Sequence, residues 1–148
     1  MTDQQPEEKP IPTGLPRRRA APRKKAQAVG ADTAEEQALA LARRIVDLAE
    51  DKKASDIMLL EIRGLTTMAD YFVICSGASE RQLGAIADGI VEGLREEIRP
   101  IGREGSANAH WVLIDFGSVV VHVMAPPERE FYQLERLWAE APLLLRVQ

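Results

Sequence analysis

The sequence predicts a single compact α/β domain in which helices pack on a mixed β-sheet. Two observations carry this prediction. Short, nearly continuous apolar runs such as Tyr71–Ser76 are typical of buried strands, and longer segments between them repeat apolar residues at helical spacing. The length of 148 residues suits one domain rather than two. Strands that are apolar on both faces need helices to cover them, and a mixed sheet with packed helices meets that need.

The net charge of −4 hides a division along the chain. Residues 1–31 contain seven Lys and Arg against three Asp and Glu, whereas residues 32–148 contain 12 basic and 20 acidic residues. Five of the nine prolines also lie in the first 22 residues. A Pro-rich segment with few large apolar residues cannot offset the entropy cost of ordering. We therefore predict a disordered basic arm over residues 1–31 and a folded acidic domain over residues 32–148.

The arm allows two interpretations. Its Lys and Arg side chains suit contact with rRNA phosphates, or it is a solvated tail that aids solubility. Asp3, Glu7 and Glu8 argue against an organelle transit peptide, because such peptides avoid acids. The single cysteine and the lack of a long apolar run give no indication of secretion or of a membrane span. We expect a cytoplasmic protein.

The folded part begins with a helix and two strands. Thr33 and Glu36 have the spacing of a capping box, and the apolar residues behind them repeat at helical spacing, which predicts a helix from about 34 to 52. The apolar run at 57–62 predicts a buried strand. Tyr71–Ser76, rich in aromatic and β-branched residues, predicts a second strand.

A second capping box, Ser79 with Gln82, predicts the start of another helix, whose apolar spacing continues to Ile98 before Pro100. Three glycines interrupt it. Each glycine costs about 1 kcal/mol relative to alanine in an exposed helix interior. We therefore expect these small residues to let a neighbouring element approach closely; they are Gly84, Gly89 and Gly93.

Trp111–Asp115 and Val119–Met124 flank a short turn that contains Gly117, which predicts a hairpin. The polar stretch at 102–110 before it is expected to be a flexible loop. Pro126 and Pro127 suit the first turn of a last helix, which Pro142 ends. The predicted stripe of that helix consists of Phe131, Leu134, Leu137 and Trp138. The predicted order is α-β-β-α-β-β-α.

The sequence shows no catalytic or metal-binding constellation. No strand carries an Asp-x-Asp or Asp-x-Glu pair for a metal-assisted phosphoryl transfer. Cys75 lies within an apolar strand, and His110 and His122 are too few and too isolated to ligate a metal with it. His122 is expected to be a hydrogen-bonded residue of the core or its rim. The turn at 77–79 suits either a bound phosphate or an ordinary connection from strand to helix.

Trp111 is the remaining residue of interest. It stands at the entrance of a predicted strand, after the polar stretch. A tryptophan in this position either fills the core or anchors an interface, and the residues alone leave both open.

The order and spacing of several motifs from about Ala38 to Pro142 resemble the ribosomal silencing factor family, also called Iojap-like. The motifs are 69–77 (ADYFVICSG), 79–82 (SERQ), 86–88 (IAD), 104–105 (EG), 111–117 (WVLIDFG), 119–123 (VVVHV) and 131–138 (FYQLERLW). The resemblance implies a fold similar to that of nucleotidyltransferases but without their catalytic acids. It implies a binding protein without a cofactor rather than an enzyme. An enzyme that acts on a nucleotide is the alternative.

The resemblance also implies a partner. Family members bind the free large ribosomal subunit through its fourteenth ribosomal protein, block association with the small subunit and repress translation when nutrients are short. The family's tryptophan maps to Trp111, with Asp115 and Glu104 as acidic neighbours; Met124 and Tyr132 are further candidates. An acidic domain suits a basic ribosomal protein. Members also tend to form homodimers, for which the glycine-bearing helix is a candidate contact.

Overall fold

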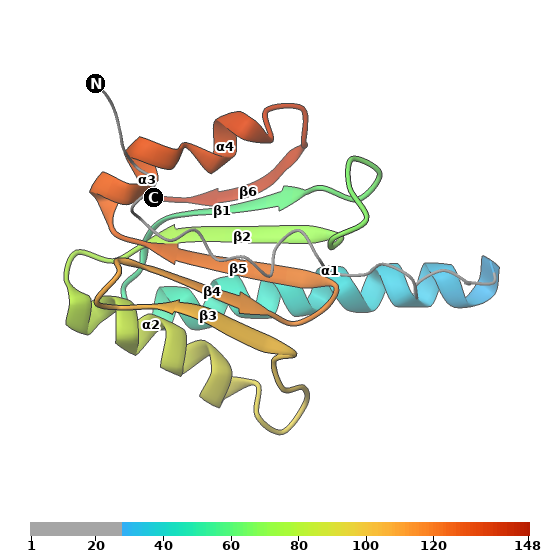
Figure 1. The fold of residues 1–148 in the computed structure, drawn as a ribbon. Helices are drawn as coiled ribbons and strands as arrows, with labels where there is room; N and C mark the ends of the chain where they lie inside the picture. The colour runs from blue at the N-terminus through green and yellow to red at the C-terminus, as the bar shows by residue number, and fades with distance from the viewer. Residues whose placement is uncertain (1–27) are drawn as a thin grey trace.

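The computed structural model describes residues 28–148, and within them six strands form one sheet (Figure 1). Their order across the sheet is β3-β4-β5-β2-β1-β6. β2 and β5 are parallel, and all other neighbours are antiparallel. The predicted mixed sheet is therefore confirmed. The strands are β1 (Ser55–Glu61), β2 (Tyr71–Ser76), β3 (Gly102–Ser106), β4 (Trp111–Asp115), β5 (Val119–Met124) and β6 (Leu143–Val147).

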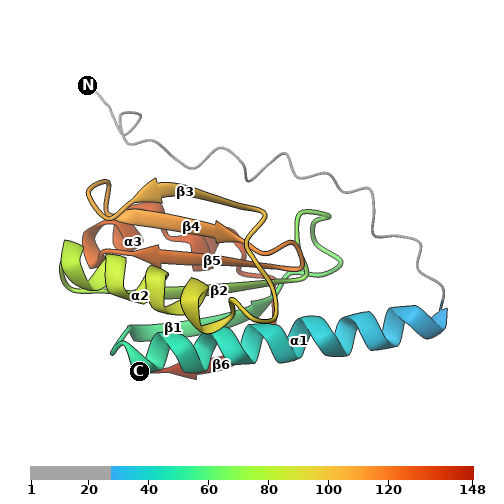
Figure 2. The ribbon, with the colours of Figure 1, turned by 90° about the horizontal axis from the view of Figure 1, so that it is seen from below.

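Helices cover both faces of this sheet. α1 (Ala28–Asp51) and α2 (Glu80–Gly93) pack on one face, which we call the α1–α2 face (Figure 2). α3 (Pro126–Tyr132) and α4 (Leu134–Leu137) lie on the other, the α3–α4 face. Successive side chains of a strand point to opposite faces. Val73 and Cys75 of β2 accordingly join the first core, whereas Phe72 and Ile74 join the second.

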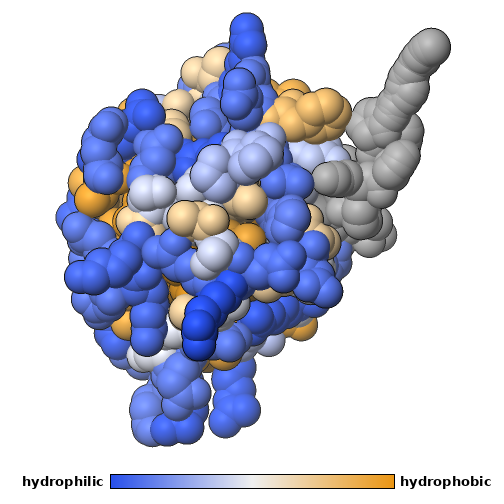
Figure 3. Space-filling view, turned by 90° about the vertical axis from the view of Figure 1, so that its left-hand side faces the viewer, coloured by the Kyte–Doolittle hydropathy of each residue, from blue (hydrophilic) through white to orange (hydrophobic). Residues whose placement is uncertain are grey.

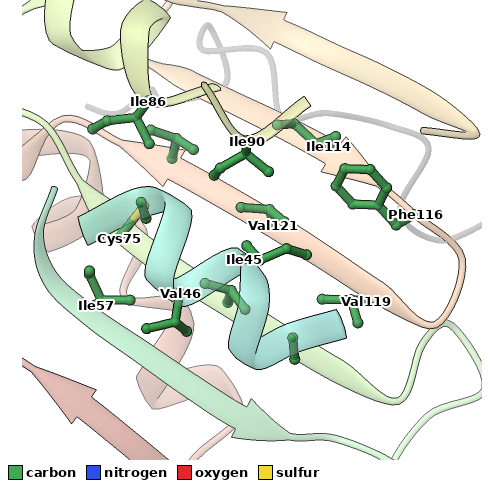
Figure 4. Packing of buried hydrophobic residues seen from close by; sticks show 14 of the residues in the cluster. Ile45, Val46, Ile57, Cys75, Ile86, Ile90, Ile114, Phe116, Val119 and Val121 are labelled. Atoms are coloured by element: carbon green, nitrogen blue, oxygen red, sulfur yellow. The ribbon is translucent and has the colours of Figure 1, made fainter. Parts of the chain in front are cut away.

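The α1–α2 face is almost entirely aliphatic. Figure 4 shows Ile45 of α1 and Ile90 of α2 in the same cluster as Val121 of β5. α1 and α2 approach closely, since a Cβ at Gly93 would lie 2.6 Å from Cδ2 of Leu48. The prediction that Gly93 lets a neighbouring element approach closely is therefore confirmed. No helix within the described residues is long and apolar enough to cross a membrane.

The glycines also bear on the predicted dimer contact. A Cβ at Gly89 would lie 2.8 Å from Cε of Lys52, which directly follows α1, and a Cβ at Gly93 would meet Leu48 of α1. These two glycines therefore serve packing within the protomer. A Cβ at Gly84, in contrast, would meet nothing within 4 Å.

Two helix boundaries were predicted wrongly. α1 begins at Ala28 rather than near residue 34, so residues 28–31 belong to a helix and not to the arm. Thr33 therefore lies within α1 and is not its N-cap residue. The rest of the predicted arm lies outside the described residues. α2 ends at Gly93, well before the predicted Ile98, and Leu94 is its C-cap.

The last predicted helix is in fact two short helices. Gln133 separates α3 from α4 with left-handed backbone angles, φ 47° and ψ 57°. β3 was expected to be a loop, and β6 was not predicted. Both are edge strands with mostly exposed side chains. β3 is polar and shows no strand pattern, whereas β6 contains the apolar run at 143–145, which the prediction overlooked. The hairpin of β4 and β5 is as predicted, with Trp111 opposite Met124.

Candidate protein-binding site

The structure brings all five predicted site residues to the α3–α4 face. Trp111 and Asp115 lie on this face of β4, since they are separated by an even number of residues. Met124 of β5 is paired with Trp111, and Glu104 of β3 is paired with Leu113, so both share that face. Tyr132 of α3 completes the group, with its ring centroid 4.8 Å from that of Trp111.

These residues differ in their exposure. Trp111 is only 5% exposed and Met124 is fully buried, whereas Glu104, Asp115 and Tyr132 are half-buried. Of the two roles left open for the tryptophan, filling the core is therefore the one it has in the free chain. The half-buried residues around it provide the accessible part of the site.

The indole of Trp111 is fixed by a buried histidine. Its N–H donates to Nδ1 of His122 across 3.2 Å. Because Nδ1 accepts this bond, the ring proton of the neutral histidine is on Nε2. His122 is 1% exposed, and burial lowers its pKa to about 3. The prediction that His122 is a hydrogen-bonded core residue is confirmed, and the pair sets the orientation of Trp111.

A continuous series of ring contacts runs from the surface into this core. The ring of Phe131 meets Tyr132 edge to face at 4.9 Å. Tyr132 contacts Trp111, and Trp111 contacts His122 at 5.9 Å. Phe72 then bridges His122 and Trp138, at 4.9 and 5.5 Å. Burial decreases along the series toward Phe131, which is 58% exposed.

Sequence reasoning missed this exposure of Phe131. It was assigned to a single apolar stripe with Leu134, Leu137 and Trp138, but only Leu134 of the four is buried. The break at Gln133 changes the helix direction, so the four residues do not share one face. The sequence does not predict the break between the two helices, because Gln is not a typical residue for a left-handed backbone conformation.

Polar contacts hold α3 against the ends of the strands. Buried Arg129 donates from Nη1 to Oγ of Ser76 at 2.8 Å and from Nε to Oε2 of Glu135 at 3.3 Å. The ring of His110 lies between two carboxylates, 3.2 Å from Glu80 of α2 and 3.4 Å from Glu128 of α3. Figure 3 looks onto this end of the molecule, where hydrophilic residues predominate.

A pocket of about 740 Å³ lies between α3, α4 and the β1–β6 side of the sheet. Its lining includes apolar Met58 and Leu143 together with Arg129 and Glu135. Arg129 and Glu135 pair with each other, as described above, and connect α3 to α4. The other charged residues of the lining are Asp56, Glu130 and Arg136.

The turn at 77–79 uses its polar groups internally. Ser79 Oγ accepts from the backbone N–H of Gln82 at 3.0 Å, and Gln82 Oε1 accepts from the N–H of Ala78 at 2.7 Å. The capping interaction is confirmed, and it takes up amides that a phosphate would need. Burial raises the pKa of Cys75 to about 12, so its thiol is protonated. Residues 28–148 contain no group of three His, Cys, Asp or Glu suited to a metal ion.

Asp115 has a local structural task as well. Its Oδ1 accepts from the backbone N–H of Gly117 at 2.8 Å, which stabilises the turn between β4 and β5. Gly117 has φ 95°, a value that glycine adopts readily. The carboxylate is thereby held at the end of β4, on the same face as Trp111.

The thiol of Cys75 is buried, and the side chains of Ser79 and Arg129 make hydrogen bonds within the domain. The α3–α4 face, in contrast, has aromatic rings and carboxylates near the surface. This arrangement is typical of an α/β protein that binds a macromolecule. Residues 35–147 match the family described as "Ribosomal silencing factor during starvation", RsfS, and the chain belongs to that family. The resemblance predicted from the motifs is therefore confirmed.

Individual relatives agree with this assignment. The ribosomal silencing factor RsfS of Bacillus subtilis is 47% identical over 95 residues, which is 64% of this chain and 80% of that protein. Mouse "Mitochondrial assembly of ribosomal large subunit protein 1" is 38% identical over 98 residues, 64% of this chain and 43% of that one. A crystal structure of a Chromobacterium violaceum protein superimposes with a TM-score of 0.66 at 35% identity, over 68% of this chain and 85% of that chain.

Proposed function

We propose that this protein binds the large ribosomal subunit through its fourteenth ribosomal protein, blocks association with the small subunit and represses translation under nutrient limitation. Family membership supports a role at the ribosome. The partner, the block and the repression are our proposal from the motifs. The observation that carries the site is the grouping of Trp111, Asp115, Glu104, Met124 and Tyr132 on one face of the sheet.

Charge supports this choice of partner. Residues 32–148 carry eight more acidic than basic residues, and ribosomal proteins are basic as a class. Complementary charge speeds encounter and orients the two surfaces, while buried aromatic residues supply affinity. Glu104 and Asp115 provide acidic side chains on the same face as Trp111 and Tyr132. A cytoplasmic location follows from the proposed target.

Sedimentation with purified large subunits tests the binding. The protein should migrate with large subunits and not with small subunits. Pre-incubation should also decrease the fraction of 70S particles formed when small subunits are added. An intact protein that stays at the top of the gradient with large subunits would contradict the proposal.

A charge reversal tests the assignment of the face. Asp115→Lys should fold, and it should bind large subunits more weakly because it reverses a charge on the proposed contact. Glu50→Lys is the matched control, since Glu50 is exposed on α1, on the opposite side of the sheet. Equal weakening by both lysine variants would mean that net charge, and not this face, determines binding.

The arm and the dimer are separate parts of the proposal. If residues 1–27 contact rRNA, their deletion should weaken binding and decrease its dependence on salt, because fewer counterions are released. A dimer is detected by sedimentation velocity at several protein concentrations. Gly84 of α2 is the one of the three glycines with open space around it, so Gly84→Arg is the variant that would disrupt a contact there.

A further inference from the structure

We infer that Phe131 makes the direct apolar contact with the partner and that Trp111 supports it from behind as a positioning residue. This inference rests on the proposed function and deepens it. It reverses the roles suggested by the motif, in which the tryptophan is the contact. The two side chains differ in accessibility. Phe131 is 58% exposed, whereas Trp111 is 5% exposed and hydrogen-bonded to His122.

Phe131 is exposed because of the backbone and not because of a loose side chain. The left-handed conformation of Gln133 ends α3 directly after Tyr132. The N–H of Gln133 donates to the carbonyl of Arg129 at 2.9 Å, which closes the last turn. Arg129 is itself anchored to Ser76 and Glu135. The helix end that carries Phe131 is therefore fixed to the sheet.

The ring series fixes the side chain as well. Phe131 meets Tyr132 with the ring planes at 86°, and Tyr132 meets Trp111 with the planes at 50°. Pairs of aromatic rings at such centroid separations attract each other in edge-to-face and tilted arrangements. The hydrogen bond to His122 restrains Trp111, so a partner that contacts the ring of Phe131 should not displace Trp111 easily. A preorganised exposed ring loses little freedom on binding, which favours its use as an anchor.

The acidic residues around Phe131 favour a basic protein surface as the binding partner. Glu130 next to Phe131 is exposed, and half-buried Glu104 and Asp115 lie on the same face of the sheet. The one basic residue of α3, Arg129, is buried in ion pairs. An exposed ring next to the exposed carboxylate of Glu130 suits the aliphatic stem and charged head of a lysine or arginine side chain. The same basic ribosomal protein proposed above has this chemistry.

The chain offers a matched control for the loss of an exposed apolar side chain. Ile101 is 69% exposed and immediately precedes β3. Its backbone N–H donates to the carbonyl of Asp115, and the next residue, Gly102, is paired with Asp115. By strand alternation the side chain of Ile101 therefore points to the α1–α2 side, away from Phe131.

The experiment measures the dissociation constant for purified large subunits, with thermal unfolding of each variant alongside. Phe131→Ala should weaken binding about tenfold or more, as expected for an anchor residue, with little change in stability. Ile101→Ala should change binding less than about twofold. Equal binding by wild type and Phe131→Ala would overturn the inference. Failure of the wild type to bind would instead overturn the proposed function.

The role of Trp111 is tested by conservative rescue. Trp111→Phe keeps a ring under Tyr132 but removes the indole N–H that His122 accepts, so it should bind within about threefold of wild type and unfold at a lower temperature. Trp111→Ala should lose both binding and thermal stability, because it leaves a cavity under Tyr132. If Trp111→Phe is fully folded at the temperature of the binding measurement but binds as weakly as Phe131→Ala, Trp111 is itself the contact and the inference is wrong.

Discussion

The two faces of the sheet are covered in different ways. On the α1–α2 face, long helices pack aliphatic side chains closely enough that Gly93 has no room for a Cβ. On the α3–α4 face, short helices joined at Gln133 cover a layer that contains Trp111, Phe72 and buried His122. The second face also has large apolar side chains at its surface, such as Phe131.

Under the proposed function, this difference separates the residues that stabilise the fold from those that recognise the partner. A closed aliphatic face stabilises the fold but offers a partner little to recognise. The α3–α4 face has a less regular cover, held by ion pairs and ring contacts, and it keeps rings and carboxylates accessible. Changes on the first face should therefore act on unfolding, and changes at the surface of the second should act on binding.

The largest expected effect is on the closed face. Ile45 is fully buried between α1 and the sheet, and Ile45→Ala should decrease the free energy of unfolding by about 3 kcal/mol. The variant protein that remains folded should still bind large subunits like wild type. Urea unfolding and sedimentation in the cold measure the two quantities. Weakened binding by a fully folded variant would break the division between the faces.

The next effect concerns the edge of the other face. Gly105 of β3 has φ 78°, and a Cβ there would lie 2.1 Å from the carbonyl oxygen of Trp111. Gly105→Ala should therefore cost about 2 kcal/mol or more from the strained backbone and the displaced strand. Gly102→Ala is the matched control, because a Cβ at Gly102 meets nothing within 4 Å. Similar unfolding midpoints for the two variants would contradict this geometry.

A smaller effect should appear as pH falls. The pKa of His122 is lowered by burial to about 3 in the folded protein, whereas an unfolded histidine titrates near 6.5. The unfolded state therefore binds more protons between these values, so stability is complete above about pH 6.5 and falls by up to about 1.4 kcal/mol per pH unit below it. Urea unfolding from pH 7 to 5 measures this slope. His122→Asn should decrease the slope, and an unchanged slope would exclude His122 as its origin.

The smallest effect is expected at the helix break. Gln133 adopts left-handed backbone angles, which are strained for a residue with a side chain, whereas glycine adopts them readily. Gln133→Gly should therefore change the free energy of unfolding by less than about 1 kcal/mol, with ribosome binding retained. Gln133→Pro cannot adopt a positive φ, so this variant should lose both stable folding and ribosome binding. Stable folding of the proline variant would show that the break is not required.

The sequence predicted the buried parts of this fold better than its edges. β2, β4 and β5 are continuous apolar runs, and their bounds or pairing were predicted correctly. β3 is an edge strand of polar residues, so local pattern could not identify it. β6 carries the apolar run at 143–145, but its side chains are mostly exposed, and it was overlooked because it directly follows Pro142. The break at Gln133 depends on tertiary anchoring through Arg129, which no local pattern contains.

The five residues of the candidate site remain a prediction from the motifs. The structure shows only that strand pairing brings them to one face. Their exposure could not be predicted, because it depends on how α3 sits against β4. For that reason Trp111 was considered as a contact, and exposed Phe131 was assigned to a buried stripe.

The most direct test of the division compares one charge reversal on each face. Glu104→Lys changes a half-buried acid on the α3–α4 face, and Glu50→Lys changes an exposed acid on α1. Their dissociation constants for large subunits are measured together at one salt concentration. The account predicts that Glu104→Lys binds about tenfold more weakly than wild type and that Glu50→Lys binds like wild type. Equal binding by the two variants, or weaker binding by Glu50→Lys, would contradict it.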